Sequence, residues 1–349
     1  MRFFDYKKLA SRVWNKEVVS YIGLIHEYKG RQQLYLKQKP EELQKLVELA
    51  KIQSTEASNE IEGIRTTTSR LKELMAEKTT PKNRNEEEIL GYRYALNLVH
   101  EYYDEIPINS NYILQLHKEM YQFLPVSFGG NFKDTPNEID AYYPDGHKEV
   151  IFKPLEPFET PDAVRMLCDE YNKAIHEYQI DPLLVIPVFI HDFLCIHPFN
   201  DGNGRMSRLL TTLLLYQNGY AVGKYISLEK KIQITKNEYY DALSASSKGW
   251  IDETNDDTAF VKYLLGTIIA AYRDFESRVD LVGEKQTSRD MVINAITQKV
   301  GKFTKSDIAD YCPKIGTSTI ENILKSLCEE GLIEKCGGGR STYYVRKKI

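Results

Sequence analysis

Two apolar segments with helical spacing, joined by a glycine-rich turn at residues 196–208, constrain this chain more than any other feature. The joining segment is Ile-His-Pro-Phe-Asn-Asp-Gly-Asn-Gly-Arg-Met-Ser-Arg. The run from Leu183 to Ile196 predicts one helix, and Met206 with the leucines that follow it predicts a second, beginning at about Arg205. The turn should therefore present backbone N–H groups at a helix N-terminus, which is a typical binding site for phosphate.

The side chains of this segment add chemistry to the predicted anion site. Arg205 and Arg208 lie at a helix start, where cations oppose the helix dipole unless an anion joins them. Asp201 offers a carboxylate for a hard cation such as Mg²⁺, and His197 can exchange protons near neutral pH. The combination predicts phosphoryl or nucleotidyl transfer, and the alternative is a helix–loop–helix with solvated arginines.

The segment resembles the active-site motif of the Fic family, H-P-F-x-[D/E]-G-N-[G/K]-R-x-x-R, at every fixed position. Most Fic proteins transfer AMP from ATP to a Ser, Thr or Tyr hydroxyl of a protein. The resemblance implies that His197 is the base, that Asp201 binds Mg²⁺ and that Phe199 anchors the loop in the core. The other implied nucleotide-binding residues are Gly202, Asn203 and Gly204 in the anion hole, Arg205 on phosphate and Arg208 on the terminal phosphate of ATP.

A second motif lies upstream, at the end of a predicted helix that begins at Pro40 and stops at Gly63. Glu62 lies in its last turn, where the helix dipole disfavours a carboxylate. Pairing Glu62 with Arg208 would relieve two unfavourable charges, and a solvated glutamate is the alternative. Ser58-x-x-x-Glu62-Gly63 also resembles the inhibitory motif of Fic proteins with an N-terminal inhibitory helix. That resemblance implies that Glu62 pairs with Arg208 and blocks productive ATP binding, with Ser58 as part of the motif.

Residues 129–154 predict a β-hairpin, because Asp145-Gly146 precedes a β-branched and aromatic run. The position corresponds to the Fic flap, which pairs with the target segment by strand addition. Lys133 replaces a frequent arginine of the family. Further along, the resemblance implies that Tyr240 contacts adenine, with core packing as the alternative. Ser247 stands where the family has an asparagine.

The composition favours an ordinary globular protein, with 42% hydrophobic and 28% charged residues. No apolar run approaches the ~20 residues that a membrane span needs, and the first residues do not resemble a secretory signal. Five scattered cysteines favour reduced thiols over a zinc site or a disulfide framework. We therefore expect a cytoplasmic protein without a membrane segment.

We expect three regions: a helical arm over 1–85 with its inhibitory helix at about 40–63, a Fic core over 86–284, and a winged helix over 285–349. The last region has a net charge of +5 and the rest −9, within a total of −4. A linker at Gln286-Thr287-Ser288, a helix from Met291 to Val300, two shorter helices and a two-stranded wing predict the winged helix. Such a domain contacts DNA or protein, and the sequence leaves both open.

The sequence thus predicts a mainly α-helical protein adenylyltransferase that uses Mg²⁺ and ATP, modifies a protein hydroxyl (its own included) and is inhibited by Glu62. One alternative is a Fic enzyme that transfers another phosphate-containing group or removes AMP. Another is a nucleotide-sensing, DNA-binding transcription regulator, against which the intact motif argues. A homodimer is left open.

Overall fold

The structure, a computed structural model of the 349-residue chain, describes residues 2–38, 40–125, 128–142, 148–283, 287–299 and 301–347. The chain forms two compact units, which are described separately. The first contains Met1–Arg31 and Ala50–Tyr272, and the second contains Gln32–Leu49 and Arg273–Ile349. These units were defined by packing and the three expected regions by sequence pattern, so the boundaries at 85/86 and 284/285 stay predictions.

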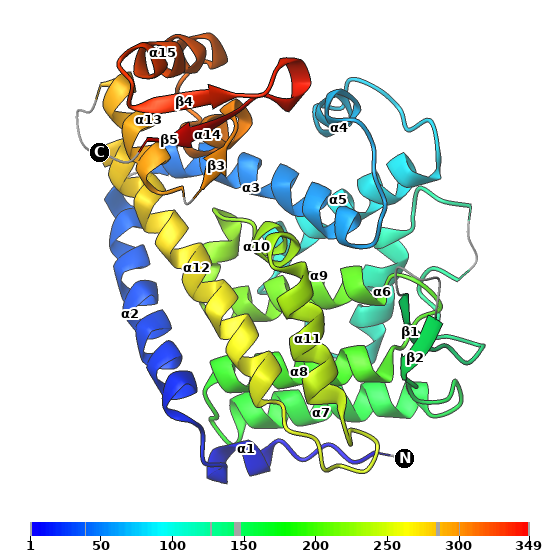
Figure 1. Cartoon of the computed structure of the whole chain (residues 1–349). Helices are drawn as coiled ribbons and strands as arrows, with labels where there is room; N and C mark the ends of the chain where they lie inside the picture. Colours follow the sequence, from blue (N-terminus) through cyan, green and yellow to red (C-terminus); the bar gives the residue numbers. More distant parts are fainter. Residues whose placement is uncertain are drawn as a thin grey trace. The chain divides into compact units, whose positions relative to one another are not determined.

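The fold is mainly α-helical, as the sequence predicts (Figure 1). No helix in the described ranges is both long and apolar enough to cross a membrane. Helices α2, α3 and α12 contribute residues to both units. The helices up to the end of α12 are α1 (Lys7–Ser11), α2 (Lys16–Gln38), α3 (Pro40–Ile61), α4 (Thr68–Met75), α5 (Arg84–Tyr102), α6 (Ser110–Met120), α7 (Thr160–His176), α8 (Pro182–Ile196), α9 (Asn203–Gln217), η1 (Ala221–Lys224), α10 (Leu228–Ile234), α11 (Lys236–Ser247) and α12 (Thr258–Gly283).

Helices α8 and α9 form the centre of the first unit, as their apolar sequences predict (Figure 1). Helices α7 and α11 pack on α8, and α5 packs on α9. Leucines 209, 210, 213 and 214 of α9 are fully buried, which is the face that the helical spacing predicts. The central pair fixes the loop between α8 and α9, because both ends of that loop continue into buried helices.

Two antiparallel strands form the predicted hairpin of the first unit, β1 (Ile139–Tyr142) and β2 (Lys148–Phe152). The predicted Asp145-Gly146 turn lies outside the described residues. Helices α4 and α10 were not predicted; both are short, and each begins at a hydroxyl cap, Thr67 and Ser227, whose side chain accepts a backbone N–H.

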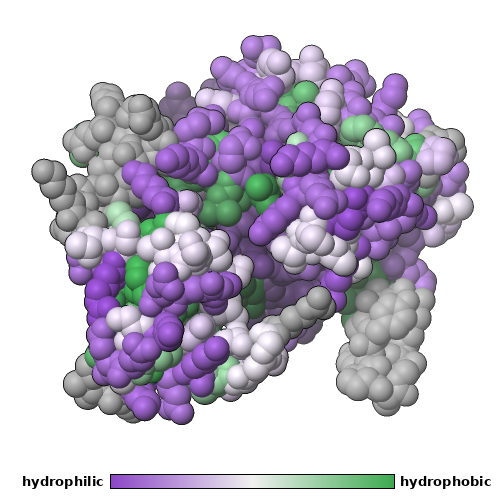
Figure 2. All heavy atoms as spheres, turned by 90° about the horizontal axis from the view of Figure 1, so that it is seen from above, coloured by the Kyte–Doolittle hydropathy of each residue, from purple (hydrophilic) through white to green (hydrophobic). Residues whose placement is uncertain are grey.

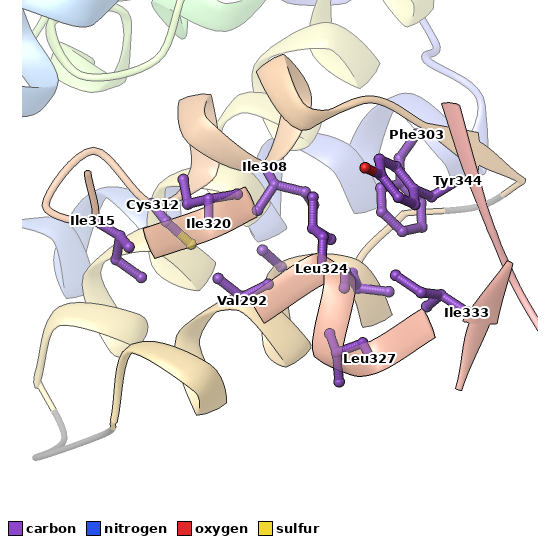
Figure 3. Close-up of a cluster of buried hydrophobic side chains, with 12 residues drawn as sticks. Val292, Phe303, Ile308, Cys312, Ile315, Ile320, Leu324, Leu327, Ile333 and Tyr344 are labelled. Atoms are coloured by element: carbon purple, nitrogen blue, oxygen red, sulfur yellow. The ribbon is translucent and has the colours of Figure 1, made fainter. Parts of the chain in front are cut away.

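The second unit contains α13 (Ser288–Thr297), α14 (Lys305–Tyr311), α15 (Thr317–Glu329) and a three-stranded antiparallel sheet in the order β3–β5–β4. Its strands are β3 (Lys302–Phe303), β4 (Ile333–Cys336) and β5 (Tyr343–Arg346), with η2 (Gly339–Ser341) before β5. Figure 3 shows its core, in which side chains of all three helices and the sheet meet, among them Val292, Ile308, Leu324 and Tyr344. The winged-helix assignment stays a prediction.

Two sequence expectations for this unit need correction. Thr287 and Ser288 are not linker residues, because Thr287 caps α13 and forms a capping box with Asp290. The predicted wing had two strands, and the structure adds β3, whose two residues were too few to show a pattern. Of the predicted linker and first helix, Gln286 and Val300 lie outside the described residues. On the face seen in Figure 2, hydrophilic residues predominate and hydrophobic ones form small separate areas.

Candidate active site

The loop between α8 and α9 is closed by its own side chains. Helix α8 ends at His197, which takes a left-handed conformation with φ 51°, and Gly202 precedes α9 with φ 82°. The amide of Asn203 brackets Phe199: its Oδ1 accepts the Phe199 N–H at 2.9 Å and its Nδ2 donates to the Phe199 carbonyl at 2.7 Å. The Asn203 side chain is therefore used to hold the loop. The groups available to bind an anion are the backbone N–H groups at the start of α9.

Lys133 and Asn137 hold the strained His197 backbone from outside the loop. Lys133 Nζ donates to the Ile196 carbonyl at 3.0 Å and to Asn137 Oδ1 at 2.9 Å. Asn137 Nδ2 donates to the carbonyls of Phe199 at 3.1 Å and His197 at 3.4 Å. A left-handed conformation costs a non-glycine residue about 1–3 kcal/mol, so a network of this kind is needed to maintain it.

The His197 imidazole has the protonation state of a base. Nδ1 donates to the Leu194 carbonyl at 3.3 Å, which leaves Nε2 as the acceptor nitrogen. Burial disfavours the charged ring and lowers the pKa of His197 to about 4, although the Leu194 hydrogen bond acts in the opposite direction. The ring is therefore neutral at pH 7 and can accept a proton at Nε2.

A second histidine, His117 on α6, supports the loop and was not predicted. Its ring stacks on Phe199, with centroids 3.7 Å apart and an interplanar angle of 3°. His117 Nδ1 accepts the Gly130 N–H at 3.0 Å, and Nε2 donates to the Asp201 carbonyl at 3.0 Å. Both nitrogens are used and burial lowers the pKa of His117 to about 4, so this ring is a neutral structural support.

Arg205 belongs to the same support. Its guanidinium, in a residue only 1% exposed, pairs with Glu88 of α5 at 2.7 Å and donates to the Tyr121 hydroxyl at 2.7 Å. Glu88 and Tyr121 come from segments more than 80 residues upstream. We refer to Glu88, His117, Tyr121 and Arg205 as the supporting cluster. The role of Arg205 on phosphate stays a proposal, since its guanidinium is committed to this cluster.

Arg208, one turn later on α9, pairs with the predicted inhibitory residues. Its NH2 donates to Glu62 Oε1 at 2.7 Å and to the Ser58 carbonyl at 2.8 Å, and its Nε donates to Ser58 Oγ at 2.8 Å. Burial alone would lower the pKa of Arg208, but the charge and hydrogen bond of Glu62, together with Tyr239 and Tyr92, outweigh that effect and raise it. A Cβ on Gly204 would overlap Glu62 Oε1, so the carboxylate lies directly against the start of α9.

One cavity of about 300 Å³ collects these groups. We refer to Glu62, His197, Gly204 and Arg208, which all line it, as the cavity cluster. Tyr240 and Ser247 of α11 line the same cavity, and Tyr240 is partly exposed to it, whereas Tyr239 is buried. The volume lies at the lower end of the range of small-molecule sites. The remaining lining residues are apolar or small: Ile139, Ile151, Phe152, Leu194, Cys195, Tyr239, Leu243 and Ser244.

Asp201 can take part in a magnesium site. Its side chain is about half exposed; Oδ1 accepts the Gly202 N–H at 2.6 Å, and Oδ2 lies 3.6 Å from Arg84. Among the described residues no group of three or more His, Cys, Asp or Glu side chains could hold a metal by itself. Mg²⁺ is typically bound by one or two carboxylates together with substrate phosphates and waters. A single exposed carboxylate beside an anion site fits that pattern.

A neutral, half-buried base, an arginine and a helix N-terminus facing one cavity define a candidate site for chemistry on phosphate groups. Residues 107–215 match the model of the Fic/DOC family.

Known proteins agree with this assignment. The chain is 27% identical over 138 residues to a Fido domain-containing protein of Dictyostelium discoideum, covering 38% of this chain and 92% of that protein. It is 28% identical over 178 residues to protein adenylyltransferase Fic of Drosophila yakuba, and 26% identical over 222 residues to protein adenylyltransferase fic-1 of Caenorhabditis elegans. These matches cover 51% and 62% of this chain but 31% and 38% of the two adenylyltransferases, about a third of their length.

Solved structures show the same fold. A Fic family protein from Desulfovibrio desulfuricans aligns with a TM-score of 0.62 at 21% identity, covering 97% of this chain and 98% of that one. A Fic domain-containing signaling protein from Bacteroides thetaiotaomicron also aligns with a TM-score of 0.62, covering 76% of this chain and all of that one. The shared fold confirms the predicted mainly helical Fic-type architecture.

Proposed function

We propose that this chain is a protein adenylyltransferase that transfers AMP from ATP to a Ser, Thr or Tyr hydroxyl of a protein, its own chain included. The observation that carries the proposal is the cavity cluster, in which a neutral His197 and the anion-binding start of α9 share one cavity with Arg208. The names of the curated relatives support AMP as the group transferred. ATP and a protein target are thus the proposed substrates.

The proposed reaction uses few side chains. His197 Nε2 accepts the proton of the target hydroxyl, whose oxygen attacks the α-phosphorus of ATP, and pyrophosphate leaves. The N–H groups at Gly202, Asn203 and Gly204 bind phosphate oxygens at the positive end of α9. Asp201 would hold Mg²⁺, which when bound neutralises charge on the phosphates. Tyr240 is proposed to contact the adenine from the α11 side of the cavity.

Glu62 is proposed to be an inhibitory residue. It occupies the guanidinium fork of Arg208 that the terminal phosphate of ATP would take, while Ser58 keeps the rest of that guanidinium in place. A charge-assisted hydrogen bond contributes ~1.5–3 kcal/mol, which corresponds to roughly 10- to 150-fold in a binding equilibrium. Removal of the carboxylate should therefore tighten ATP binding and raise transfer by a factor in that range.

The test compares the native chain with Glu62→Gly, each incubated with Mg²⁺, a cell lysate and ATP labelled on the α-phosphate. We expect stronger protein labelling with Glu62→Gly, and mass spectrometry should find the mass of AMP and not of phosphate on the modified peptide. Arg208→Ala in the Glu62→Gly background should abolish the increase in labelling, because that increase depends on the freed Arg208 binding ATP. Absence of label with Glu62→Gly would overturn the activity, and equal labelling of the two proteins would overturn the inhibition alone.

The compartment of the chain and the partner of its second unit are proposed from the sequence. The cytoplasm is the proposed compartment. The second unit is proposed to contact DNA or protein, and its net charge of +5 over 285–349 supports a polyanionic partner. A gel shift with genomic fragments, lost when the chain is cut near residue 284, tests the DNA contact.

A further inference from the structure

A cluster of reactive side chains at the cavity has no part in the proposed transfer. His191 of α8 is fully buried, and its Nδ1 lies 2.9 Å from Asp257 Oδ1, at an angle that does not align with the ring N–H. Its Nε2 lies 3.1 Å from Ser247 Oγ and 3.5 Å from Cys195 Sγ. Cys195 and Ser247 line the cavity together with His197. The cluster thus joins a buried carboxylate, an imidazole and a cavity-lining thiol.

The surroundings of His191 favour its protonated form. When Ser247 Oγ donates to the Leu243 carbonyl at 2.8 Å, it is an acceptor for a proton on His191 Nε2, 3.1 Å away. Nδ1 faces the Asp257 carboxylate and is protonated as well. Burial by itself lowers the pKa of His191, but the interactions with Cys195 and Asp257 outweigh it and raise the pKa to about 10.

The imidazolium lies one helical turn before Cys195 on α8, next to the sulfur. Cys195 Sγ is 3.5 Å from His191 Nε2 and 3.5 Å from Ser247 Oγ. The sulfur therefore lies beside a ring whose cationic form can pair with a thiolate, the nucleophilic form of cysteine. Cys195 is only 2% exposed, and its access to small reagents is through the cavity that it lines.

Cys168 of α7 provides an internal contrast. It is 1% exposed, and burial raises the pKa of its thiol to about 12. It does not line the cavity. The two cysteines are therefore almost equally buried, and they differ in charge environment and in access.

We propose that Cys195 is an oxidation site at which hydroperoxides convert the thiolate to a sulfenic acid inside the cavity, and that His191 and Asp257 activate it. The thiolate attacks one peroxide oxygen, so that an S–O bond forms and the O–O bond breaks. Sulfur loses two electrons, and the other peroxide oxygen leaves as hydroxide, or as alkoxide from an organic hydroperoxide. It takes a proton from the His191 imidazolium or from solvent to give water or an alcohol. A thiol reductant reverses the change through a mixed disulfide.

The modification places a polar oxygen in the cavity that also contains His197 and Arg208. If the cavity binds ATP, as in the proposed function, oxidation should weaken nucleotide binding and bound ATP should shield Cys195. This consequence rests on the proposed function, whereas the reactivity of Cys195 does not.

The experiment treats the native full-length chain with hydrogen peroxide at neutral pH, traps sulfenic acid with dimedone and measures each cysteine peptide by mass spectrometry. We expect Cys195 to be trapped at least roughly tenfold faster than Cys168. Equal rates, or trapping of Cys195 only after denaturation, would overturn the proposal. The comparison needs no variant, so it does not depend on whether a substitution folds.

Variants then test the activating residues. His191→Gln should slow trapping of Cys195 roughly tenfold, whereas trapping of Cys168 in the same protein should not change. An unchanged rate in a folded His191→Gln protein would overturn the role of His191. Added Mg²⁺ and ATP should slow trapping in the native chain. Fast trapping without that protection would leave the oxidation site standing and overturn the shared use of the cavity.

Discussion

The cavity cluster and the supporting cluster each place a histidine and an arginine against one short loop, yet the two sets of residues have different chemistry. In the supporting cluster His117 uses both ring nitrogens in hydrogen bonds, and Arg205 pairs with a buried glutamate of α5. In the cavity cluster His197 keeps Nε2 as an acceptor, and Arg208 pairs with Glu62, which is 32% exposed.

The comparison teaches that residue type does not determine role in this loop. What differs is whether the partner can be exchanged: a nucleotide phosphate can replace an accessible carboxylate in the cavity, but not one that is buried among helices. An ion pair that lines a cavity is therefore a candidate for regulation, and one buried among helices is a candidate for stability.

The largest expected effect is on AMP transfer, and it distinguishes His197 from His117. In a Glu62→Gly background, His197→Ala should lower AMP transfer by ~10²–10⁴-fold, because it removes the base. ATP binding should change little, because the proposed partner of His197 Nε2 is the target hydroxyl. The melting temperature should change less than on loss of His117, because His197 makes one side-chain hydrogen bond, to the Leu194 carbonyl, and His117 makes two. Radiolabel transfer and calorimetric ATP titration measure the two quantities.

His117→Ala is the matched change in the supporting cluster. It removes the stack on Phe199 and two hydrogen bonds, so it should lower the melting temperature. Near-native transfer by the His197→Ala protein would contradict the assignment of the base.

The next effect concerns the two glutamates. Glu88→Gln should lower the free energy of unfolding by about 3–5 kcal/mol, because it leaves the Arg205 guanidinium charged and buried without its carboxylate. Glu62→Gln should cost less than about 1.5 kcal/mol, because Glu62 is 32% exposed and Arg208 keeps its two hydrogen bonds to Ser58. Urea unfolding of both variants measures the difference. Similar losses in the two proteins would show that the clusters do not differ in this way.

The effect that is smallest per pH unit and per residue is one that both clusters share. Burial holds the pKa of His117 and His197 at about 4 and that of His100 at about 3, each below the ordinary value of 6.5. Between pH 6.5 and about pH 4 these histidines bind protons in the unfolded chain but not in the folded chain. The free energy of unfolding should therefore fall as the pH drops from 6.5 towards 4, by at most about 1.4 kcal/mol per pH unit for each ring.

Urea titrations across this pH interval measure the slope, and His100→Gln, outside both clusters, should reduce it by the share of one ring. His191 has its pKa raised to about 10, so its contribution to stability is complete below pH 6.5 and is lost at higher pH. His191 therefore does not change the pH dependence of the free energy of unfolding between pH 6.5 and pH 4. Stability that stays constant or rises on acidification would contradict the buried neutral state of the three rings.

The cavity cluster was largely predictable from the sequence and the supporting cluster was not. The α8–α9 loop is one continuous motif. Two helix-end charges of the wrong sign suggested the pairing of Glu62 with Arg208, and the resemblance of Ser58-x-x-x-Glu62-Gly63 to the Fic inhibitory motif implied it. Glu88, His117 and Tyr121 lie on other helices, and their burial depends on how α5 and α6 pack on the loop. A glutamate in a helix is usually solvated, so nothing in the local pattern marks Glu88 as a buried partner.

The same limit applies to the Cys195 cluster. His191 and Cys195 are four residues apart on one helix, a spacing that a sequence can show. Asp257 comes from just before α12, and Ser247 from the end of α11, and only the fold places them beside His191. In the second unit the helices were predicted from their apolar spacing, whereas β3 depends on pairing with β5 and has no signal of its own.

The close contact between Gly204 and Glu62 predicts which mutations should separate Glu62 from Arg208. A single added methyl group at residue 204 would meet the far end of the Glu62 side chain, which can move away. One at Gly202 would meet the side chains of Met120 and Tyr121, and the φ of 82° there is strained for any residue with a Cβ. Gly204→Ala is therefore a candidate gain-of-function change, and Gly202→Ala a loss-of-function one. Release from inhibition would then be reachable by mutation at two positions 142 residues apart in the sequence, Glu62 and Gly204. A selection for hyperactive alleles should recover changes at both.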